Sequence, residues 1–489
     1  MKVDASISGQ KAFETLGEPT TKWRSLIVSY ALQLIIGIQF SIYVTSMWPY
    51  LAKLEPSSTL NFFGWIMAVF SVGQMVSSKI FGYWVQKTWS SKNPTICGFV
   101  FIIIGNFIYA LLPLLTSNHG WFMMLSRIIV GIGSGNLCVL RGYCSMSTKK
   151  DDISRVMPLA AGSYVLGLAL GPAIQSAFVF VGSGFSIGMV IFDFYTLPAY
   201  LMALVSFGSI LVVLFYFDEN YAGILTSNET KDPYVVVPKF DKIAAYTCIY
   251  LYFMLQAITT SIEVLATPFT ITLYNWTDKQ AVLYGGILQF IGCIMDVTNY
   301  LALSFTKLGK IDKRVLIIGS SLAFIAYHLL LLPWDFYDGP LDYVKLVENS
   351  TVKDQEFGGC LREYTWCSHT TRVPLVIYIF GFTVVLSFAF PYTAASVSVL
   401  YSEILGPRNQ GSMQGTMEFF GSFARCVIPV IQPILFADYG YLWPFLMNLF
   451  TVLIGLTFLV LFFHRIIPLE VIPRVGVPTP YKSGVFYRL

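Results

Sequence analysis

Four polar side chains recur on one face of the otherwise apolar segment 243–272. They are Gln256, Thr260, Glu263 and Thr267, spaced by four, three and four residues. Such spacing places them on one face of an α-helix. Amide, hydroxyl and carboxyl groups on such a face bind polar solutes, and a carboxyl group in a poorly hydrated cleft also accepts a proton readily. The stripe therefore predicts a cavity-lining helix that binds a solute and a proton.

A second polar stripe lies in the segment 26–50. Gln39, Tyr43 and Ser46 follow one another at intervals of four and three residues, which again places them on one helical face. We expect these three side chains to line the same cavity from another helix.

Arg127 stands inside a further apolar segment. A charged group near the middle of a membrane costs at least ~2.5 to 3.5 kcal/mol on insertion scales, so it normally faces a partner or a water-filled cavity. We expect Arg127 to bind substrate or form part of a gate; the alternative is a structural ion pair. Glu263 has a similar expected depth in the other half of the chain and is the predicted counter-charge.

Two more arginines interrupt apolar segments. Arg141 lies near a segment end, where a long side chain reaches the interface, so we expect a simple anchor. Arg425 falls near the expected midplane and predicts a functional role or a hydrogen bond to a neighbouring helix. Glu418 precedes it by seven residues, ~10 Å along a helix, which we take as too far for a direct bond. Asp296 is either the partner of Arg425 or a repulsive neighbour of Glu418.

The elements that must position these residues are membrane-spanning helices. The chain has 489 residues, of which 55% are apolar and 12% charged, and a mean hydropathy of +0.66. Its apolar residues gather into twelve runs of about 20 residues, the length that crosses a ~30 Å hydrocarbon core. The runs lack the alternation of a membrane barrel. The sequence predicts an all-α polytopic membrane protein of 12 transmembrane helices in two pseudo-symmetric six-helix bundles.

The expected spans follow one another along the chain with boundaries good to a few residues. They are 26–50, 62–85, 95–115, 121–146, 156–181, 196–217, 243–272, 281–305, 314–333, 374–400, 412–436 and 443–466.

Positive charges predict the orientation. Of the 31 Lys and Arg residues, 21 fall in the two tails and the loops after even-numbered spans, six in the loops after odd-numbered spans and four inside helices or at their ends. Both termini should therefore be cytosolic. The net charge of +4 reflects this topology and gives no case for nucleic-acid binding. The expected parts are an N-tail 1–24, a bundle 25–217, a linker 218–242, a bundle 243–466 and a C-tail 467–489.

The longest predicted loop, 334–373, lies on the non-cytosolic side. It holds Cys360 and Cys367, which we expect to form a disulfide, with two free thiols as the alternative. It also holds the glycosylation acceptor Asn349. A second acceptor on this side, Asn275, lies close to a helix end. A third, Asn228, falls in the cytosolic linker and should be unused.

An internal repeat supports two related halves. Pro49 precedes Gly73 by 24 residues in the first half, and Pro268 precedes Gly292 by the same interval in the second. The segments GPAIQ and IPVIQ also occupy equivalent places in the fifth and eleventh spans. Together these matches favour two bundles related by an axis along the membrane normal.

Several motifs resemble those of the major facilitator superfamily. Arg127 is followed by Gly131 and Gly133 as in the superfamily's fourth span, and Gly167 with Gly171-Pro172 matches the Gly-x-x-x-Gly-Pro motif of the fifth. The loop after Gly82 departs from the family pattern because it lacks the acidic residue. The resemblance implies a two-bundle transporter in which spans 1, 4, 7 and 10 line a central cavity.

A narrower resemblance runs from about residue 22 to 466. The stretches SMWPYLAKLEPSS, FFGWIMAVFSVGQMV and RIIVGIGSGNLCVLRGY, together with the Cys, six residues, Cys pattern, are similar to the lysosomal branch associated with neuronal ceroid lipofuscinosis. This resemblance implies residence in the endolysosomal membrane and an activity of solute transport or chloride permeation.

The glycines of these motifs predict helix contacts. Gly131 and Gly135 are four residues apart and share a stripe with Arg127, so another helix can approach closely there. Gly167, Gly171 and Pro172 are read in the same way as packing and bending positions, although a bend also suits a rocking helix.

Other function classes lack their motifs. The sequence has no ATP-binding loop and no hydrolase set, and its four histidines are too dispersed for a metal site. We expect no cofactor, no catalytic residue, no metal and no enzyme activity. Tyr221 and Tyr234 begin short patterns that sorting adaptors recognise.

Three interpretations remain. The first is a proton-coupled secondary transporter that moves a small, anionic solute across the lysosomal or endosomal membrane. The second is a chloride or anion channel on the same fold. The third is a non-transporting membrane receptor or scaffold.

Overall fold

A computed structural model describes most of the chain. The described residues are 12–13, 21–43, 46–56, 58, 60–178, 184–187, 190–222, 224, 239–344, 358–469, 479–481 and 484–486. Asn228, Tyr234 and Asn349 lie outside these ranges, so the predictions made for them are not addressed by the structure.

The described residues of the first half of the chain form eight helices, one short 3₁₀ turn and small strand pairs. Its helices are α1 (Trp23–Ser41), α2 (Met47–Leu54), α3 (Leu60–Thr88), α4 (Lys92–Ala110), η1 (Leu112–Leu114), α5 (His119–Ser134), α6 (Leu137–Met146), α7 (Ile153–Ala177) and α8 (Leu197–Tyr216). A parallel pair joins β1 (Ala12–Phe13) to β4 (Asn220–Tyr221), and an antiparallel pair joins β2 (Phe185–Ile187) to β3 (Val190–Phe192).

The described residues of the second half are also mainly helical. Its elements are α9 (Lys242–Tyr274), α10 (Asp278–Phe305), η4 (Lys307–Lys310), α11 (Lys313–Leu330), η6 (Thr365–His369), α12 (Leu375–Phe380), the π-helical turn η7 (Gly381–Val385), α13 (Leu386–Leu405), α14 (Gly411–Tyr439) and α15 (Leu442–Leu461). The strands β5 (Thr479–Tyr481) and β6 (Gly484–Phe486) form a small antiparallel pair near the end of the chain.

The expected all-α membrane architecture is confirmed. Eleven helices within the described ranges are long and apolar enough to cross a membrane. The helix at the predicted second span, α3, has 29 residues but is not one of these eleven.

Three predicted spans differ in detail from the helices. The first ends at Ser41, and the separate helix α2 contains Pro49, which the sequence placed at the end of that span. The fourth span is interrupted between α5 and α6 at Gly135 and Asn136. The tenth contains the π-helical turn η7. Hydropathy measures the length of an apolar run and does not report such local changes of helix geometry.

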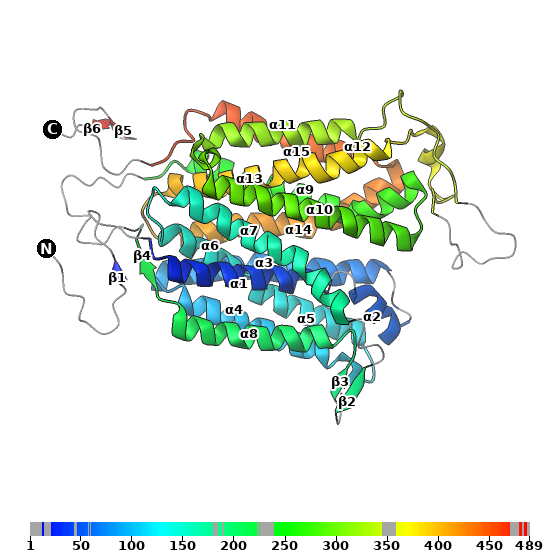
Figure 1. Cartoon of the computed structure of the whole chain (residues 1–489), viewed down its shortest axis with the longest axis horizontal. Helices are drawn as coiled ribbons and strands as arrows, with labels where there is room; N and C mark the ends of the chain where they lie inside the picture. The colour runs from blue at the N-terminus through cyan, green and yellow to red at the C-terminus, as the bar shows by residue number, and fades with distance from the viewer. Residues whose placement is uncertain are drawn as a thin grey trace.

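Two ends of the molecule need names. We call the end at which α1 begins and α15 ends the tail end, and the opposite end, which carries η6, the loop end. In Figure 1, α1, α4, α5 and α8 lie on one side of the molecule and α9, α11, α13 and α15 on the other, with α3, α7, α10 and α14 between them.

The two halves touch mainly in the tail halves of these middle helices. A methyl group on Gly415 of α14 would lie 2.5 Å from the carbonyl oxygen of Ser78 on α3, and Gly82 and Gly411 approach each other just as closely. Asn409 donates to the Val85 carbonyl oxygen at 3.1 Å. Because these glycines have no side chains, α3 and α14 approach to backbone contact.

A second contact joins α7 to α10. The Tyr300 ring of α10 covers Gly162 of α7, where an added methyl group would lie 3.0 Å from its Cβ. The Arg155 guanidinium lies 4.7 Å from the centre of the Phe305 ring. The tail end is thus closed by two helix pairs.

The loop end carries the predicted disulfide. Cys360 and Cys367 are bonded, which confirms the pairing. Asn275 ends α9 in the left-handed conformation, with φ of 54°, and its amide nitrogen donates to Asp342 at 2.9 Å.

The first of the two sorting patterns is not accessible. Tyr221 is 1% exposed and Ile224 is 3% exposed, and the Tyr221 hydroxyl donates to the Trp89 carbonyl oxygen at 3.1 Å. Adaptor recognition of this pattern is therefore a prediction that the fold contradicts, since a bound tyrosine must protrude.

Candidate functional site

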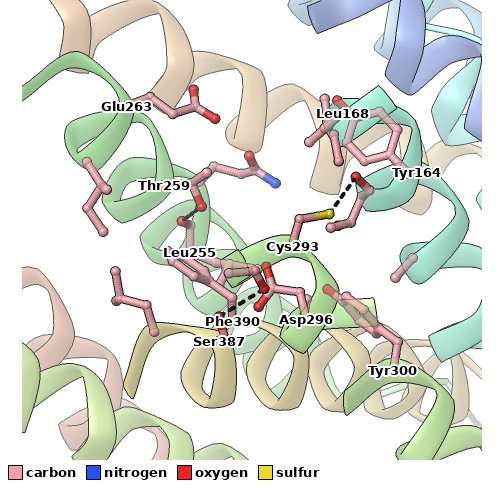
Figure 2. A pocket seen from close by; sticks show the side chains of 18 of the residues that line it. Tyr164, Leu168, Leu255, Thr259, Glu263, Cys293, Asp296, Tyr300, Ser387 and Phe390 are labelled. Atoms are coloured by element: carbon pink, nitrogen blue, oxygen red, sulfur yellow. Dashed lines mark hydrogen bonds between the residues drawn. The ribbon is translucent and has the colours of Figure 1, made fainter. Parts of the chain in front are cut away.

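A cavity of about 170 Å³ lies between the two halves of the molecule. Figure 2 shows many of the side chains that line it. Its walls come from α6 and α7 of the first half and from α9, α10, η7 and α13 of the second. This is the arrangement expected of a site between two moving bundles.

The predicted stripe on α9 contributes to this cavity only in part. Gln256 and Glu263 line it, together with Thr259. Glu263 is exposed to the cavity, and the cation whose charge acts on it is Arg425. Thr260 is 6% exposed and does not line the cavity, so its predicted role is wrong; the neighbouring Thr259 takes its place. Thr267 is exposed nearer the loop end, outside the cavity lining.

Asp296 of α10 is the other carboxyl group in the wall. Its Oδ1 atom is buried and has no hydrogen-bond partner among the described residues. The Ser387 hydroxyl donates to the Gly292 carbonyl oxygen at 3.1 Å and also lies beside the Asp296 carboxyl group. No ion pair links Asp296 to a lysine or arginine in the part of the chain that the structure describes.

Below the cavity, toward the tail end, Glu418 joins the two halves. It is 1% exposed and accepts from Arg141 at 2.8 Å and from Arg425 at 2.7 Å. The Tyr252 hydroxyl donates to the same carboxylate at 2.8 Å and accepts from Arg141 at 2.6 Å. Because Arg141 belongs to α6 and Glu418 to α14, this network of Arg141, Glu418, Arg425 and Tyr252, the central ion network, bridges the bundles.

Two sequence expectations are corrected here. Arg141 is not an interfacial anchor, because it is only 12% exposed and ion-paired across the bundle boundary. Glu418 and Arg425 do bond directly, because two long side chains on one helical face span the ~10 Å between their backbones. Asp296 is a partner of neither arginine among the described ion pairs.

Arg127 does not meet Glu263. It is 2% exposed and lies inside the first half, with its guanidinium 4.6 Å from the Phe70 ring centre and 5.9 Å from that of Tyr43. Its Nε and Nη1 atoms have no hydrogen-bond partner within the described ranges. The predicted pair is therefore not formed.

The glycine stripe explains this placement. Gly131 packs against the Phe70 backbone and Gly135 against Ser77, both on α3. Arg127 shares their helical face, so packing of that face on α3 carries the arginine into the helix interface and away from the cavity.

The α1 stripe also faces the interior of its own bundle. Gln39 and Tyr43 are 0% and 1% exposed, and both bond to Asn106 of α4, the Tyr43 hydroxyl at 2.6 Å. Ser46 lies beyond the end of α1 and is 2% exposed. None of the three lines the cavity, because the polar face of α1 meets a polar residue of α4.

Gly167 and Gly171 occupy a second close approach. A methyl group at Gly167 would overlap the Leu34 carbonyl oxygen, and one at Gly171 would overlap Ser41, both on α1. Pro172 follows within α7. Their positions fit the packing interpretation.

Residues that sequence reasoning missed are mainly aromatic. Tyr164, Tyr252 and Tyr300 line the cavity, and the rings of Tyr164 and Tyr252 lie 5.5 Å and 5.7 Å from the Arg141 guanidinium. Tyrosines in apolar spans carry no signal of their own, since the same residues fill cores and membrane interfaces. Within the described ranges, no three His, Cys, Asp or Glu side chains gather as metal ligands would.

Comparisons with known proteins agree with this architecture. The family model of the Major Facilitator Superfamily matches residues 30–344. The "Major facilitator superfamily domain-containing protein 8" of Xenopus laevis is 29% identical over 486 residues, covering 93% of this chain and 94% of that protein. The "SPX domain-containing membrane protein" of Oryza sativa subsp. indica is 26% identical over 180 residues, covering 37% and 24%.

A solved structure shares the fold. The human organic anion transporter MFSD10 (TETRAN) matches with a TM-score of 0.62 at 14% sequence identity, covering 89% of this chain and 99% of that one.

Proposed function

Because this chain belongs to the Major Facilitator Superfamily, we propose that it is a secondary active transporter that moves a small solute by alternating access. The cavity between the bundles, bridged below by the central ion network, is the observation that carries this proposal. A rocking motion would break the contacts at one end of the bundles and form others at the opposite end.

The proposed orientation places the tail end in the cytosol. The excess of Lys and Arg in the tails and even-numbered loops supports it. The contacts of Gly82, Gly411 and Gly415 would then close the cytosolic side, and the solute would enter from the loop end. We propose the endolysosomal membrane as the location, on the motif resemblance described above, with the loop end in the acidic lumen.

Glu263 is the proposed proton-coupling residue. It lies eleven residues before the loop end of α9 at Tyr274, ~17 Å at the helical rise. It is exposed to the cavity and close enough to Arg425 for their charges to interact. A luminal proton would neutralise Glu263 and remove that attraction within the second bundle, which would change the charge balance around Arg425 and Glu418 and so bias the equilibrium between conformations.

The solute is proposed to carry an anionic group. Arg141 is the basic side chain in the described lining of the cavity, and its guanidinium has more N–H groups than the central ion network uses. Arg127, which the sequence favoured for this contact, is enclosed in the first bundle.

The experiment compares two modes of transport for Glu263→Gln in proteoliposomes. Tritiated small carboxylic and amino acids are tested for accumulation driven by a pH gradient and for exchange without a gradient. We expect the variant to lose at least tenfold in accumulation and to keep exchange, since only coupling needs the titrating group. Glu363→Gln, at an exposed loop position, is the control.

Three results would each reject a part of the proposal. Accumulation at normal strength in Glu263→Gln removes the coupling role, and loss of both modes assigns Glu263 a structural role instead. Conductance far above carrier turnover in patch-clamped organelles would replace the carrier by an anion channel.

A further inference from the structure

We propose that the cavity binds a zwitterionic solute, with its ammonium group at Asp296 and its acidic group at Arg141. This inference rests on the proposed transport function and adds the chemical class of the solute.

The unpartnered carboxyl oxygen is the first observation. Asp296 Oδ1 is buried in the cavity wall without a hydrogen-bond partner in the described structure. A buried carboxyl oxygen without a hydrogen-bond partner is costly. An ammonium group of a solute offers three N–H donors and one positive charge. It can therefore donate a hydrogen bond to Asp296 Oδ1 and neutralise the charge of the carboxylate.

Arg141 is the proposed partner of the acidic group of the solute. Its described hydrogen bonds to Tyr252 and Glu418 both involve Nη1. The guanidinium has five N–H groups in a planar fork, and its side chain borders the same cavity. Its other N–H groups are available to a carboxylate or another small acidic group.

Size and aromatic content fit a molecule of amino-acid dimensions. A cavity of about 170 Å³ holds on the order of ten water molecules. The rings of Tyr164, Tyr252, Tyr300, Phe382 and Phe390 border it. These rings favour an apolar solute body, and their faces favour a nearby cation.

Three tritiated probes with the same phenol ring test the proposal. Tyrosine is zwitterionic, 4-hydroxyphenylpropionate keeps only the carboxylate, and tyramine keeps only the ammonium. Equilibrium binding is measured on the full chain in lipid nanodiscs at acidic pH. We expect the wild-type protein to bind tyrosine at least tenfold more tightly than either of the other two.

The Asp296→Asn variant locates the ammonium. Its affinity for tyrosine should fall at least tenfold, while that for 4-hydroxyphenylpropionate changes less than twofold. Asp335→Asn, at an exposed loop position, should change neither. Binding of 4-hydroxyphenylpropionate by Asp296→Asn also shows that the variant is folded.

Each other result overturns the inference. Equal or tighter binding of 4-hydroxyphenylpropionate, tighter binding of tyramine, no binding of any probe, or unchanged tyrosine affinity in Asp296→Asn would remove the ammonium site. None of these results decides proton coupling, because that is read from accumulation and exchange by Glu263→Gln.

Discussion

Glu418 accepts from Arg141 of the first bundle and from Arg425 of its own helix. Glu418 and Arg425 are buried and Arg141 is 12% exposed. For buried ion pairs, removal of one partner typically destabilises by about 3–5 kcal/mol, because the remaining charge is left uncompensated. The contribution of each residue of the central ion network to the free energy of unfolding therefore depends on the others.

A double-mutant cycle tests their coupling. We expect Arg141→Gln and Glu418→Gln each to lower the free energy of unfolding in detergent micelles by about 3–5 kcal/mol. The double variant should lose less than the sum of the two. Lys53→Gln removes an exposed partner of Asp193 and should cost less than about 1 kcal/mol. Strict additivity of the two buried changes would show that they do not interact.

Sequence periodicity predicted some of these residues and misplaced others. The spacing of Gln256 and Glu263 identified a cavity face correctly. The same spacing misled for Gln39 and Tyr43, because Asn106 offers polar partners inside the bundle. Periodicity shows which side chains share a face; what lies opposite depends on how each helix is rotated in its bundle.

At the scale of helices, glycines set the distances between axes. Gly131 and Gly135 hold α5 against α3 within one bundle, whereas Gly82, Gly411 and Gly415 hold α3 against α14 across the two bundles. The first contact lies within one bundle, and the second would open under the proposed alternating access.

Gly415→Val tests the second contact. The added side chain meets the Ser78 carbonyl oxygen and Gly82 of α3, so we expect the tail end to open while each bundle stays folded. A cysteine introduced at the half-buried Ser412 should then react several-fold faster with a membrane-impermeant maleimide. Gly319→Val, where an added methyl group has no neighbour within 4 Å, is the control. An unchanged reaction rate would show that this contact does not close the tail end.

The sequence also did not predict the interruptions in the fourth and tenth spans. The reason differs from the one given above for the polar stripes. The break at Gly135 and Asn136 and the π-helical turn Gly381–Val385 each lie within a segment that is apolar enough on average to form a single span. Because hydropathy is averaged over such a segment, it does not report where the helical hydrogen bonds change.

For the whole molecule, the membrane class and the family fold followed from hydropathy and motifs, since both depend on local properties of the chain. The pairing of Arg141 with Glu418 did not, because it joins residues 277 positions apart. Only the packing of the two bundles brings them together.

The proposed orientation of the chain in the membrane can be tested by finding which asparagines carry a glycan. After expression in animal cells, glycosidase treatment should shift the wild-type protein on a gel and should not shift Asn349→Gln. Asn275→Gln should behave like the wild type, because the Asn275 side chain lies at a helix end and bonds to Asp342. A glycan on Asn228, in the linker assigned to the cytosol, would invert the proposed topology.

The Glu418 carboxylate, which Arg141 and Arg425 share, also affects the free energy needed to separate the bundles. If Arg141 withdraws with its own helices, Glu418 still holds Arg425, and Arg141 still lies over the Tyr164 ring of the same bundle. Glu418 therefore keeps an opposite charge after such a separation, and the Arg141 cation keeps an aromatic contact. The Arg141–Glu418 ion pair can therefore stabilise the conformation seen here and still break and re-form during the proposed transport cycle.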